Sequence, residues 1–375
     1  MFYRVIIIDN DSEAVEKISA SLRDSKDFEV VSTFDNVGAA LGQSNVFRPD
    51  LFLIDVDNVE NRDMIPAFVD LFPKGLILCT ISKWDSKIAE ECTIHGAFGC
   101  ILKNFNSEEL KDNISLYQQR GKAEIARTFA FFSPKGRAGK TTFIVMLALA
   151  LAKKSGESVA IIDADLQFGD TAIFFDVEPM HTLVEATRDV NLLSPISLSP
   201  YFLPITNHLK LLCSPTKPEY AELVEFDKLI DVIQMAGSLY RYILIDLPSG
   251  MSDLTFNICE ISDTTFVLGM FNTGLETQHI KKALSIFRGW TDEGKHIHVV
   301  FSRVNPCTEQ ERLKLSKEIG RPVTLILPND YNVVSEANRG QMLEELDSKT
   351  IVYGKVDEFA DVLIQNRQEE LDLLR

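Results

Sequence analysis

The sequence predicts an α/β protein with two doubly wound parallel-sheet domains, a smaller one followed by a larger one. Three observations carry this prediction. The chain has 375 residues, more than a single core usually organises. Short runs of β-branched and aromatic residues alternate with helical patterns, as is typical of parallel sheets whose strands are joined by helices. The alternation is interrupted near residue 120 and then resumes, so the interruption marks the domain boundary.

The first series contains five predicted strands, which predict a flavodoxin-like sheet over residues 1–120. They are "RVIIID", "FEVVSTF", "PDLFLID", "GLILCTI" and "GCILK". Between the first two, "SEAVEKISASL" places Ala14, Val15, Ile18 and Leu22 on one face of a helix.

The polar segment "YQQRGKAE" ends this series, and we place a linker at residues 121–127 and the second domain at 128–375. Seven further runs predict the strands of a larger parallel sheet. They are "RTFAFFS", "SVAIIDAD", "LKLLCS", "RYILIDL", "TTFVLGMF", "HIHVVFS" and "PVTLILP". At the end of the chain, "DEFADVLIQNRQEELDLLR" has an apolar helical face in acidic company, which favours a packing helix over a membrane anchor.

Composition and charge limit the class of protein. Hydrophobic residues make up 45% of the chain and charged residues 25%, as in ordinary folded proteins. The 55 Asp and Glu outnumber the 38 Lys and Arg, and the formal charge of −17 disfavours sequence-independent attraction to DNA or anionic lipid. The start of the chain lacks the features of a secretory signal, and no apolar run approaches the ~20 residues that span a bilayer. We therefore expect a cytoplasmic protein.

Cysteines and histidines give no sign of a metal site. The six cysteines lack CxxC spacing, and all except Cys307 lie in apolar runs, which predicts buried thiols in a reducing compartment. His279, His296 and His298 lack metal-ligand spacing with cysteines or acids.

The stretch "SPKGRAGKTT" lies between the strand "RTFAFFS" and the helix "TTFIVMLALALAKK", which is the context of a phosphate-binding loop. Backbone N–H groups of such a loop and of the helix start cradle phosphates. Lys140 is expected to reach the β and γ phosphates, and the Thr141 hydroxyl to bind Mg²⁺. The alternative is a simple glycine turn at a helix start.

Three aspartates follow strands of the second series. "IIDADLQFGD" places Asp163 and Asp165 at a strand end, and "YILIDLPSG" places Asp246 at another. Asp246 is expected to hold Mg²⁺, because Mg²⁺ prefers oxygen ligands and retained waters. Asp163 or Asp165 is expected to orient the attacking water, with Asp163 as a further metal candidate. Alternatively, these aspartates cap helices.

The segment "KGRAGKTT" resembles the deviant Walker A motif KGGxGK[ST] of the MinD/ParA group of ATPases, and the early lysine, Lys135, is its mark. In that group the early lysine contacts the nucleotide of a partner subunit. The resemblance therefore implies an ATP-sandwich homodimer in which Lys135 joins Lys140, Asp163 and Asp165 as catalytic residues.

The implied nucleotide-binding residues lie in three segments. "ILPNDYNVVSEANRGQML" is similar to the group's segment near the nucleotide base, so the likeness extends over roughly residues 127 to 350. These residues are Lys135, Gly136, Arg137, Ala138, Gly139, Lys140, Thr141 and Thr142 in the loop, with Ser302, Pro328 and Asn329 near the base. The implied cofactors are ATP and Mg²⁺.

The sequence departs from the motif at several positions. Pro134 replaces the usual first glycine, and Arg137 replaces a glycine of the deviant motif. Because a positive φ is costly for an L-residue, we expect the backbone at Arg137 to lie in an ordinary region. Its guanidinium either contacts phosphates or the dimer seam, or is solvated. Ser302 stands where many relatives carry an asparagine that contacts the base.

The first domain resembles a response-regulator receiver. Asp55 matches the phosphoacceptor position, and Asp9, Thr80 and Lys103 match the acidic, switch and lysine positions. A lysine and Mg²⁺ can neutralise a phosphorylated aspartate. However, Asn10 replaces one of the usual paired acids, and Asn104 stands where proline is usual. We therefore favour a docking or dimerising module over a receiver that is regulated by phosphorylation.

The segment "DADLQFGDTAIFFDVEPMHTLVEA" is similar to the CpaE/TadZ branch, whose members combine an atypical receiver with a MinD/ParA-like ATPase. This resemblance implies a slowly hydrolysing, ATP-dependent dimeric switch that places or assembles the Tad (Flp) pilus secretion machinery. Its implied partners are pilus assembly proteins, which bring it to a pole or the membrane face, and no specific nucleic acid is expected. The alternatives are a ParA/MinD-type partition or division-site ATPase, which the acidic charge disfavours, and a phosphorylation-driven two-component regulator.

Overall fold

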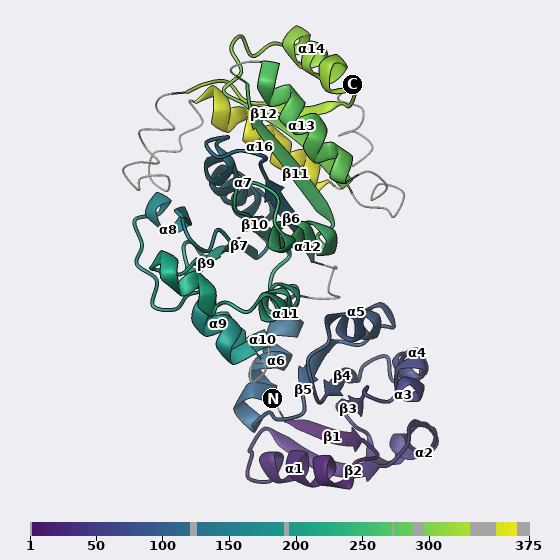
Figure 1. Ribbon diagram of the computed structural model, residues 1–375. Helices are drawn as coiled ribbons and strands as arrows, with labels where there is room; N and C mark the ends of the chain where they lie inside the picture. Colours follow the sequence, from purple (N-terminus) through teal and green to yellow (C-terminus); the bar gives the residue numbers. More distant parts are fainter. Residues whose placement is uncertain are drawn as a thin grey trace. The chain divides into compact units, whose positions relative to one another are not determined.

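Five parallel strands form the sheet of the first unit, in the order β2-β1-β3-β4-β5 (Figure 1). The computed structural model describes residues 2–120, 126–190, 195–271, 274–287, 296–330 and 350–365. The strands are β1 (Tyr3–Ile8), β2 (Phe28–Phe34), β3 (Leu51–Asp55), β4 (Leu76–Ile81) and β5 (Gly99–Leu102). The helices are α1 (Ser12–Leu22), α2 (Val37–Gln43), α3 (Val59–Asp63), α4 (Ile65–Leu71), α5 (Ser86–Ile94) and α6 (Ser107–Arg120), with a 3₁₀ turn at Ser44–Phe47. All five predicted strands are present.

Two apolar clusters cover the faces of this sheet, because successive strand side chains point to opposite sides. Ile6 and Phe52 pack in one cluster with α2, α4 and α5, and Val5 and Leu53 pack in the other with α1 and α6. Ile18 and Leu22 of α1 are buried, as the helical pattern predicts. The sheet is therefore covered on both faces, and its polar groups gather at the carboxyl ends of the strands.

The second unit contains an eight-stranded sheet in the order β13-β12-β11-β6-β10-β7-β9-β8. Its strands are β6 (Arg127–Phe132), β7 (Val159–Asp163), β8 (Leu203–Pro204), β9 (Leu209–Leu212), β10 (Tyr242–Asp246), β11 (Thr264–Met270), β12 (His296–Ser302) and β13 (Val323–Ile326). Its helices are α7 (Lys140–Ser155), α8 (Thr171–Phe174), α9 (Leu183–Asp189), α11 (Phe226–Ala236), α12 (Asp253–Ile261), α13 (Gly274–Ile286), α14 (Glu309–Ile319) and α16 (Ile351–Ile364), with a 3₁₀ turn at Pro218–Leu223.

Seven of these strands are the predicted ones, and they are parallel. The eighth, β8, pairs antiparallel with β9 at the sheet edge, so the sheet is not wholly parallel as the sequence predicted. A two-residue strand is too short to show a hydrophobic period.

Helix α7 is apolar around most of its circumference because it lies between the sheet and α16 (Figure 1). Phe143 of α7 packs against Phe131 of β6 and Phe359 of α16. At the far end of α7, the Lys154 ammonium lies 2.8 Å from Asp357 and 2.5 Å from Asp361 of α16. The prediction of a C-terminal packing helix is confirmed for α16, while residues 366–375 lie outside the described part.

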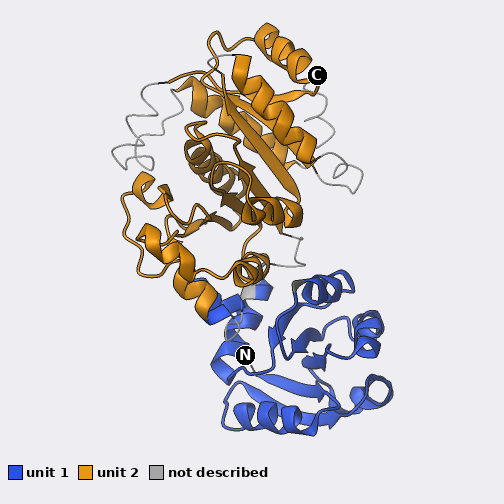
Figure 2. Ribbon diagram, in the orientation of Figure 1, with its two compact units in different colours: residues 1–125, 189–199 blue, residues 126–188, 200–375 orange. Residues whose placement is uncertain are grey.

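The chain divides into two compact units, coloured separately in Figure 2: residues 1–125 with 189–199, and residues 126–188 with 200–375. The first unit thus includes a short helix, α10 (Pro195–Leu198), that lies beside α6. The Ser197 hydroxyl donates to Glu109 Oε1 at 2.6 Å. A 3₁₀ turn at Ser199–Tyr201 follows α10. Most of the predicted linker, residues 121–125, lies outside the described residues.

Candidate functional site

The loop between β6 and α7 has an unusual backbone. The Ser133 hydroxyl donates to the Lys135 carbonyl at 2.6 Å, and Gly250 N–H donates to the Ser133 carbonyl at 3.0 Å. Two positions have positive φ, Arg137 at 68° and Gly139 at 71°. The prediction of an ordinary backbone at Arg137 is therefore wrong: this loop keeps the left-handed turn even where an L-residue stands in it, at a cost of roughly 1–2 kcal/mol.

Several N–H groups of the loop lack an acceptor among the residues that the structure describes. In the described part of the chain, no acceptor lies on the N–H groups from Gly136 to Thr142. The first carbonyl to accept from α7 is that of Gly139, which takes the Phe143 N–H at 3.0 Å. The N–H groups before it lack helical partners, as at every helix start. Together with the positive end of the helix dipole, they form a concave site suited to an anion such as a phosphate.

Lys140, Thr141 and Asp246 meet at the start of α7. The Lys140 ammonium contacts Asp246 Oδ1, and the Thr141 hydroxyl donates to Asp246 Oδ2 at 2.6 Å. Lys140 is 8% exposed and Asp246 1% exposed. The sequence predicted these three residues as a phosphate contact and two Mg²⁺ ligands. The structure brings them together at the carboxyl ends of neighbouring parallel strands.

The donor set fits Mg²⁺. The Thr141 hydroxyl and the Asp246 carboxylate are adjacent oxygen ligands of the type Mg²⁺ prefers, beside the phosphate-binding N–H groups. When bound, the ion would neutralise charge on nucleotide phosphates. Lys140, whose ammonium carries three N–H donors, would supply donors to the same phosphates.

Asp163 lies beside this group at the end of β7, where it is 1% exposed. Its Oδ2 accepts the Thr171 N–H at 3.1 Å and its Oδ1 the Asp165 N–H at 3.3 Å, so Asp163 holds the loop that follows β7. Burial, and then the negative charge of Asp246, raise the pKa of Asp163 to about 7.

Asp165 is half-buried and its Oδ1 accepts the Phe168 N–H at 3.3 Å. Gly169 of the same loop is closely packed, because a Cβ there would lie 2.2 Å from Ser214 Oγ and 2.6 Å from both oxygens of Asp163. Only glycine fits, and the loop carrying Asp165 therefore has a defined position.

The remaining predicted residues divide into exposed and buried positions. Lys135, Gly136 and Arg137 are exposed at the front of the loop. Ser302 ends β12, and its buried hydroxyl donates to the Ala138 carbonyl at 2.7 Å. Beyond β13, Pro328 is half-buried and Asn329 exposed, while the rest of the predicted base segment, residues 331–343, lies outside the described part.

The first unit contains a second charged cluster, at the carboxyl ends of β1, β3 and β5. The Lys103 ammonium lies 2.9 Å from Asp9, 2.8 Å from Asp55 and 3.2 Å from Asp57. Burial lowers the pKa of Lys103, but its bonds to Asp55 and Asp9 outweigh burial and raise that pKa. Burial raises the pKa of Asp55 against the effect of Lys103. Thr80 is buried at the end of β4.

Sequence reasoning missed Asp57 and Ser82 in this cluster. Asp57 accepts the Ser82 N–H at 3.0 Å and its hydroxyl at 2.6 Å. The available signal was spacing, because Asp57 stands two residues after Asp55 and Ser82 two after Thr80. The predicted set Asp9, Asp55 and Lys103 is brought together, and the single positive charge of Lys103 is shared among three carboxylates.

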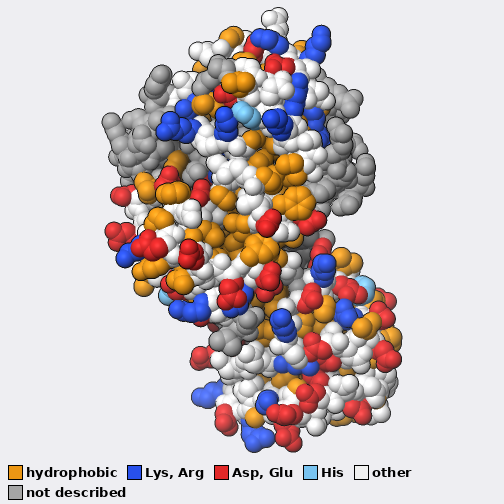
Figure 3. Space-filling view, viewed as in Figure 1, with side chains coloured by type: hydrophobic (Ala, Val, Ile, Leu, Met, Phe, Trp, Pro, Cys, Tyr) orange, Lys and Arg blue, Asp and Glu red, His pale blue; other side chains and the backbone are white. Residues whose placement is uncertain are grey.

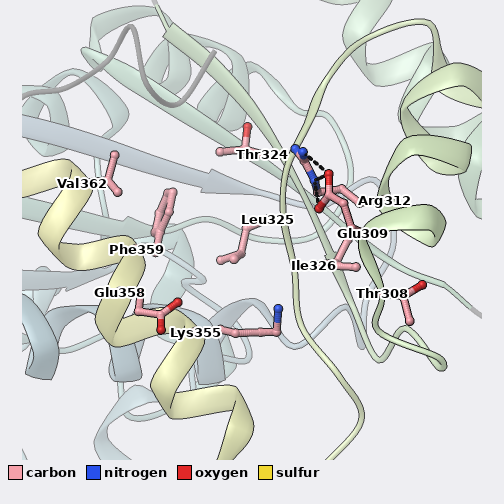
Figure 4. Close-up of a pocket in the computed structure, with 10 residues that line it drawn as sticks. All are labelled: Thr308, Glu309, Arg312, Thr324, Leu325, Ile326, Lys355, Glu358, Phe359 and Val362. Carbon is pink, nitrogen blue, oxygen red and sulfur yellow. Dashed lines mark hydrogen bonds and ion pairs between the residues drawn. The ribbon is translucent and has the colours of Figure 1, made fainter. Parts of the chain in front are cut away.

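A separate cavity of about 270 Å³ lies between α14, β13 and α16 (Figure 4). Its Arg312 is engaged by Glu309 and by the Val323 carbonyl, and Lys355 and Glu358 of α16 line it from another side. None of its lining residues belongs to the phosphate-binding loop or the acidic strand ends.

Other expectations concern cysteines, metals and membranes. Five cysteines are buried and Cys307 is intermediate, as predicted. In the part of the chain that the structure describes, no three His, Cys, Asp or Glu side chains form a metal-binding group. None of the described helices combines the length and apolar content needed to cross a membrane.

The sequence models of two families match this chain. The first, described as a CobQ/CobB/MinD/ParA nucleotide binding domain, matches residues 129–343, more than half of the chain. The second, the response regulator receiver domain, matches residues 5–115.

One curated relative and two solved structures illustrate the likeness. A putative septum site-determining protein MinD of Mesostigma viride is 27% identical over 254 residues, which are 65% of this chain and 85% of that protein. A ParA family ATPase from Chlorobium tepidum TLS has a TM-score of 0.58 at 22% identity, covering 64% of this chain and 99% of that one. The septum site-determining protein MinD from Pyrococcus horikoshii OT3, complexed with Mg-ADP, has a TM-score of 0.54 at 18% identity, covering 64% and 97%. At these identities the structures share the fold.

Proposed function

The chain belongs to the CobQ/CobB/MinD/ParA nucleotide-binding family and joins that domain to a receiver domain, and from this premise we propose that it is an ATP-dependent dimeric switch. The observation that carries the proposal is the group formed by Lys140, Thr141 and Asp246 beside a row of unpaired N–H groups. This group offers a cation, two oxygen ligands and phosphate donors within one site. The Mg-ADP in the Pyrococcus horikoshii relative supports the choice of cofactor.

Slow hydrolysis is the proposed reaction. The carboxylate of Asp165 is the better candidate for orienting the attacking water, because both oxygens of Asp163 already hold backbone N–H groups. Replacing Asp165 with Ala should keep ATP binding and lower the rate of phosphate release. Unaltered turnover in that variant would move the role to another residue.

Dimerisation is proposed from the exposed front of the loop. Lys135 is exposed, while Lys140 already occupies the position next to the phosphate donors. Large apolar side chains are also exposed in the loops that follow two strands ending at the site: Phe168 after β7 and Met251 after β10. The second unit presents gathered hydrophobic side chains on its surface in Figure 3. A second copy of the chain would cover such side chains and bring Lys135 to the facing nucleotide.

The proposed output is placement or assembly of the Tad pilus secretion machinery, as in CpaE/TadZ proteins. Its support is the fusion of a receiver with this ATPase domain, together with the similar segment at residues 163–186. In this proposal the receiver is a docking or dimerising module. Asn10 supports that role, since it stands in place of one of the usual paired acids and removes a carboxylate that could hold a metal. The protein would concentrate at a pole or the inner membrane face through its partners.

One experiment tests the switch directly. Sedimentation of the full chain with no nucleotide, with ADP and Mg²⁺, and with ATP and Mg²⁺ should give a dimer only with ATP. A mass that is the same in all three conditions rules out the ATP-dependent switch.

A second candidate, a partition or division-site ATPase, is favoured by the relatives named ParA and MinD. A salt-dependent gel shift with nonspecific DNA separates it from the first, because partition on DNA needs phosphate contacts that the charge of −17 disfavours. Phosphorylation-driven output is tested by acetyl-phosphate labelling, which should modify Asp55 only if the receiver is active.

A further inference from the structure

Ser302, at the end of β12, contacts the phosphate-binding loop, although the two are far apart in the sequence. Its hydroxyl donates to the Ala138 carbonyl at 2.7 Å, and the side chain is 7% exposed. The Ser302 residue is itself fixed, because β12 pairs with β11 along its whole length and the Ser302 carbonyl accepts the Phe271 N–H at 3.1 Å. A rigid strand end therefore holds one carbonyl of the loop.

That carbonyl lies between two strained positions. Arg137 and Gly139, on either side of Ala138, have φ of 68° and 71°. An L-residue at positive φ persists only where the surrounding structure holds it. The Ser302 hydrogen bond is a contact of this kind, because rotation of the peptides around Ala138 would break it.

The same contact sets the direction of an N–H group. The peptide between Ala138 and Gly139 is trans, so its C=O and N–H point in opposite directions. With the carbonyl held toward Ser302, the Gly139 N–H points away from β12, and no acceptor lies on it among the described residues. A free N–H next to Lys140 is a donor available to phosphate.

We propose that Ser302 is a positioning residue for phosphate binding: its hydroxyl orients the Ala138–Gly139 peptide so that the Gly139 N–H faces the phosphates of the nucleotide. The inference rests on the proposed nucleotide-binding function and specifies how the site is held ready. Because the group that Ser302 positions binds phosphate, its effect should appear with every ligand that carries a diphosphate.

The test compares three variants of the full chain. Ser302→Ala removes the hydroxyl and Ser302→Thr keeps it. Ser262→Ala is the matched control, since Ser262 is also buried and its hydroxyl also donates to a carbonyl at 2.7 Å, that of Ile258 in α12. Calorimetry gives the affinities for ATP, ADP and inorganic pyrophosphate, and thermal unfolding gives the stability of each variant.

We expect Ser302→Ala to bind all three ligands about 3- to 10-fold more weakly, the loss of one ordinary hydrogen bond. Ser302→Thr should bind as the natural chain does. Ser262→Ala should lose stability without losing affinity, and so separates positioning from a purely structural role. If Ser302→Ala is too unstable to assay, Ser302→Cys, with nearly the same volume and a weaker donor, takes its place and should show the same direction of change.

The outcomes distinguish the two levels of the proposal. A natural chain that binds neither ATP nor ADP overturns the proposed function and this inference with it. A natural chain that binds nucleotide, with Ser302→Ala or its Cys substitute binding equally well, overturns only the role of Ser302. Equal losses in Ser302→Ala and Ser262→Ala overturn it too, because the effect would then be general to buried serines.

Discussion

The ammonium of Lys140 and the carboxylate of Asp246 form a buried ion pair at the point where α7 begins. The two residues are 106 positions apart in sequence and meet because β6 and β10 are neighbouring parallel strands. Each residue compensates the charge of the other, which would be costly to bury alone. Since the ammonium carries three N–H donors, Lys140 has donors left for an anion bound at the loop beyond its contact with Asp246.

Replacing Lys140 with Ala should weaken ATP binding about 10- to 100-fold, because a charge-assisted phosphate contact is lost. Isothermal titration calorimetry measures this change. Lys154→Ala is the control, since Lys154 is also on α7 and also pairs with aspartates, but at the opposite end of the helix. Unchanged ATP affinity in Lys140→Ala would remove the loop from the nucleotide site.

Asp163 should make the second unit less stable as pH rises. Its pKa is about 7 in the fold against an ordinary 3.8, so between pH 4 and pH 7 the folded chain binds more protons than the unfolded chain. The free energy of unfolding contributed by this group therefore falls through that window and is constant below and above it. Asp163→Asn cannot titrate and should flatten the decline.

Urea unfolding at pH 5, 6, 7 and 8 measures the slope of the free energy of unfolding against pH. Hydrogen exchange of peptides that contain β7 then follows the same change close to Asp163. Asp165→Asn is the control, because Asp165 is half-buried on the same loop. The explanation fails if Asp163→Asn keeps the slope of the natural chain.

Gly169→Ala should destabilise the loop after β7. The new Cβ would approach Ser214 Oγ to 2.2 Å and the oxygens of Asp163 to 2.6 Å, so the loop must shift. We expect a loss of roughly 1–3 kcal/mol, as in other overpacked sites, and slower hydrolysis because Asp165 moves with the loop. Gly274→Ala at the start of α13 is the control, since nothing lies within 4 Å of its Cβ. Thermal unfolding that gives equal midpoints for the two variants would contradict this account.

Much of this architecture is predictable because its signals are local. Each of the twelve predicted strands is a short apolar run, and Lys140, Thr141 and Asp246 each follow or precede such a run at a position set by parallel-sheet geometry. The pairing of Lys103 with Asp9 and Asp55 is predictable for the same reason, since all three lie at carboxyl ends of strands in one sheet.

Other features depend on contacts between distant residues, and the sequence carries no periodic signal for them. The hydrogen bond of Ser302 to Ala138 joins positions 164 apart, and the bond of Ser197 to Glu109 joins positions 88 apart. The positive φ of Arg137 was mispredicted because intrinsic preference was weighed without the tertiary contacts that hold Ala138. Strand β8 was not predicted, because a strand of two residues is too short to show a hydrophobic period.

The Arg137→Gly variant should be more stable than the Arg137→Ala variant. Both replacements remove the guanidinium, but only glycine adopts the observed φ of 68° without strain, a difference of about 1 kcal/mol. The same pair of replacements at Lys135, which is not among the positive-φ residues, should give the opposite order, since glycine is there only more flexible. Denaturant midpoints of the four variants test the order. If alanine is the more stable replacement at both positions, the left-handed turn is not held in solution.

Lys135 is exposed at the front of a loop that already contains Lys140. A second lysine is redundant for the phosphates of its own subunit but useful to a facing one, where partial desolvation strengthens contacts between charges. Lys135→Ala should therefore stay folded and bind ATP, because Lys140 and the loop N–H groups remain. Its ATP-dependent dimerisation and its hydrolysis should weaken together.

Arg137 complicates this test, because a guanidinium two residues away could replace the ammonium at the seam. The double variant Lys135→Ala with Arg137→Gly removes both cations and also relieves the strained φ. Sedimentation with ATP and Mg²⁺ should show a weakened dimer in the single variant and a monomer in the double variant, at concentrations where the natural chain is dimeric. An undiminished ATP-dependent dimer in both variants would mean that neither cation reaches across the two-fold axis, and that the loop serves only the nucleotide of its own subunit.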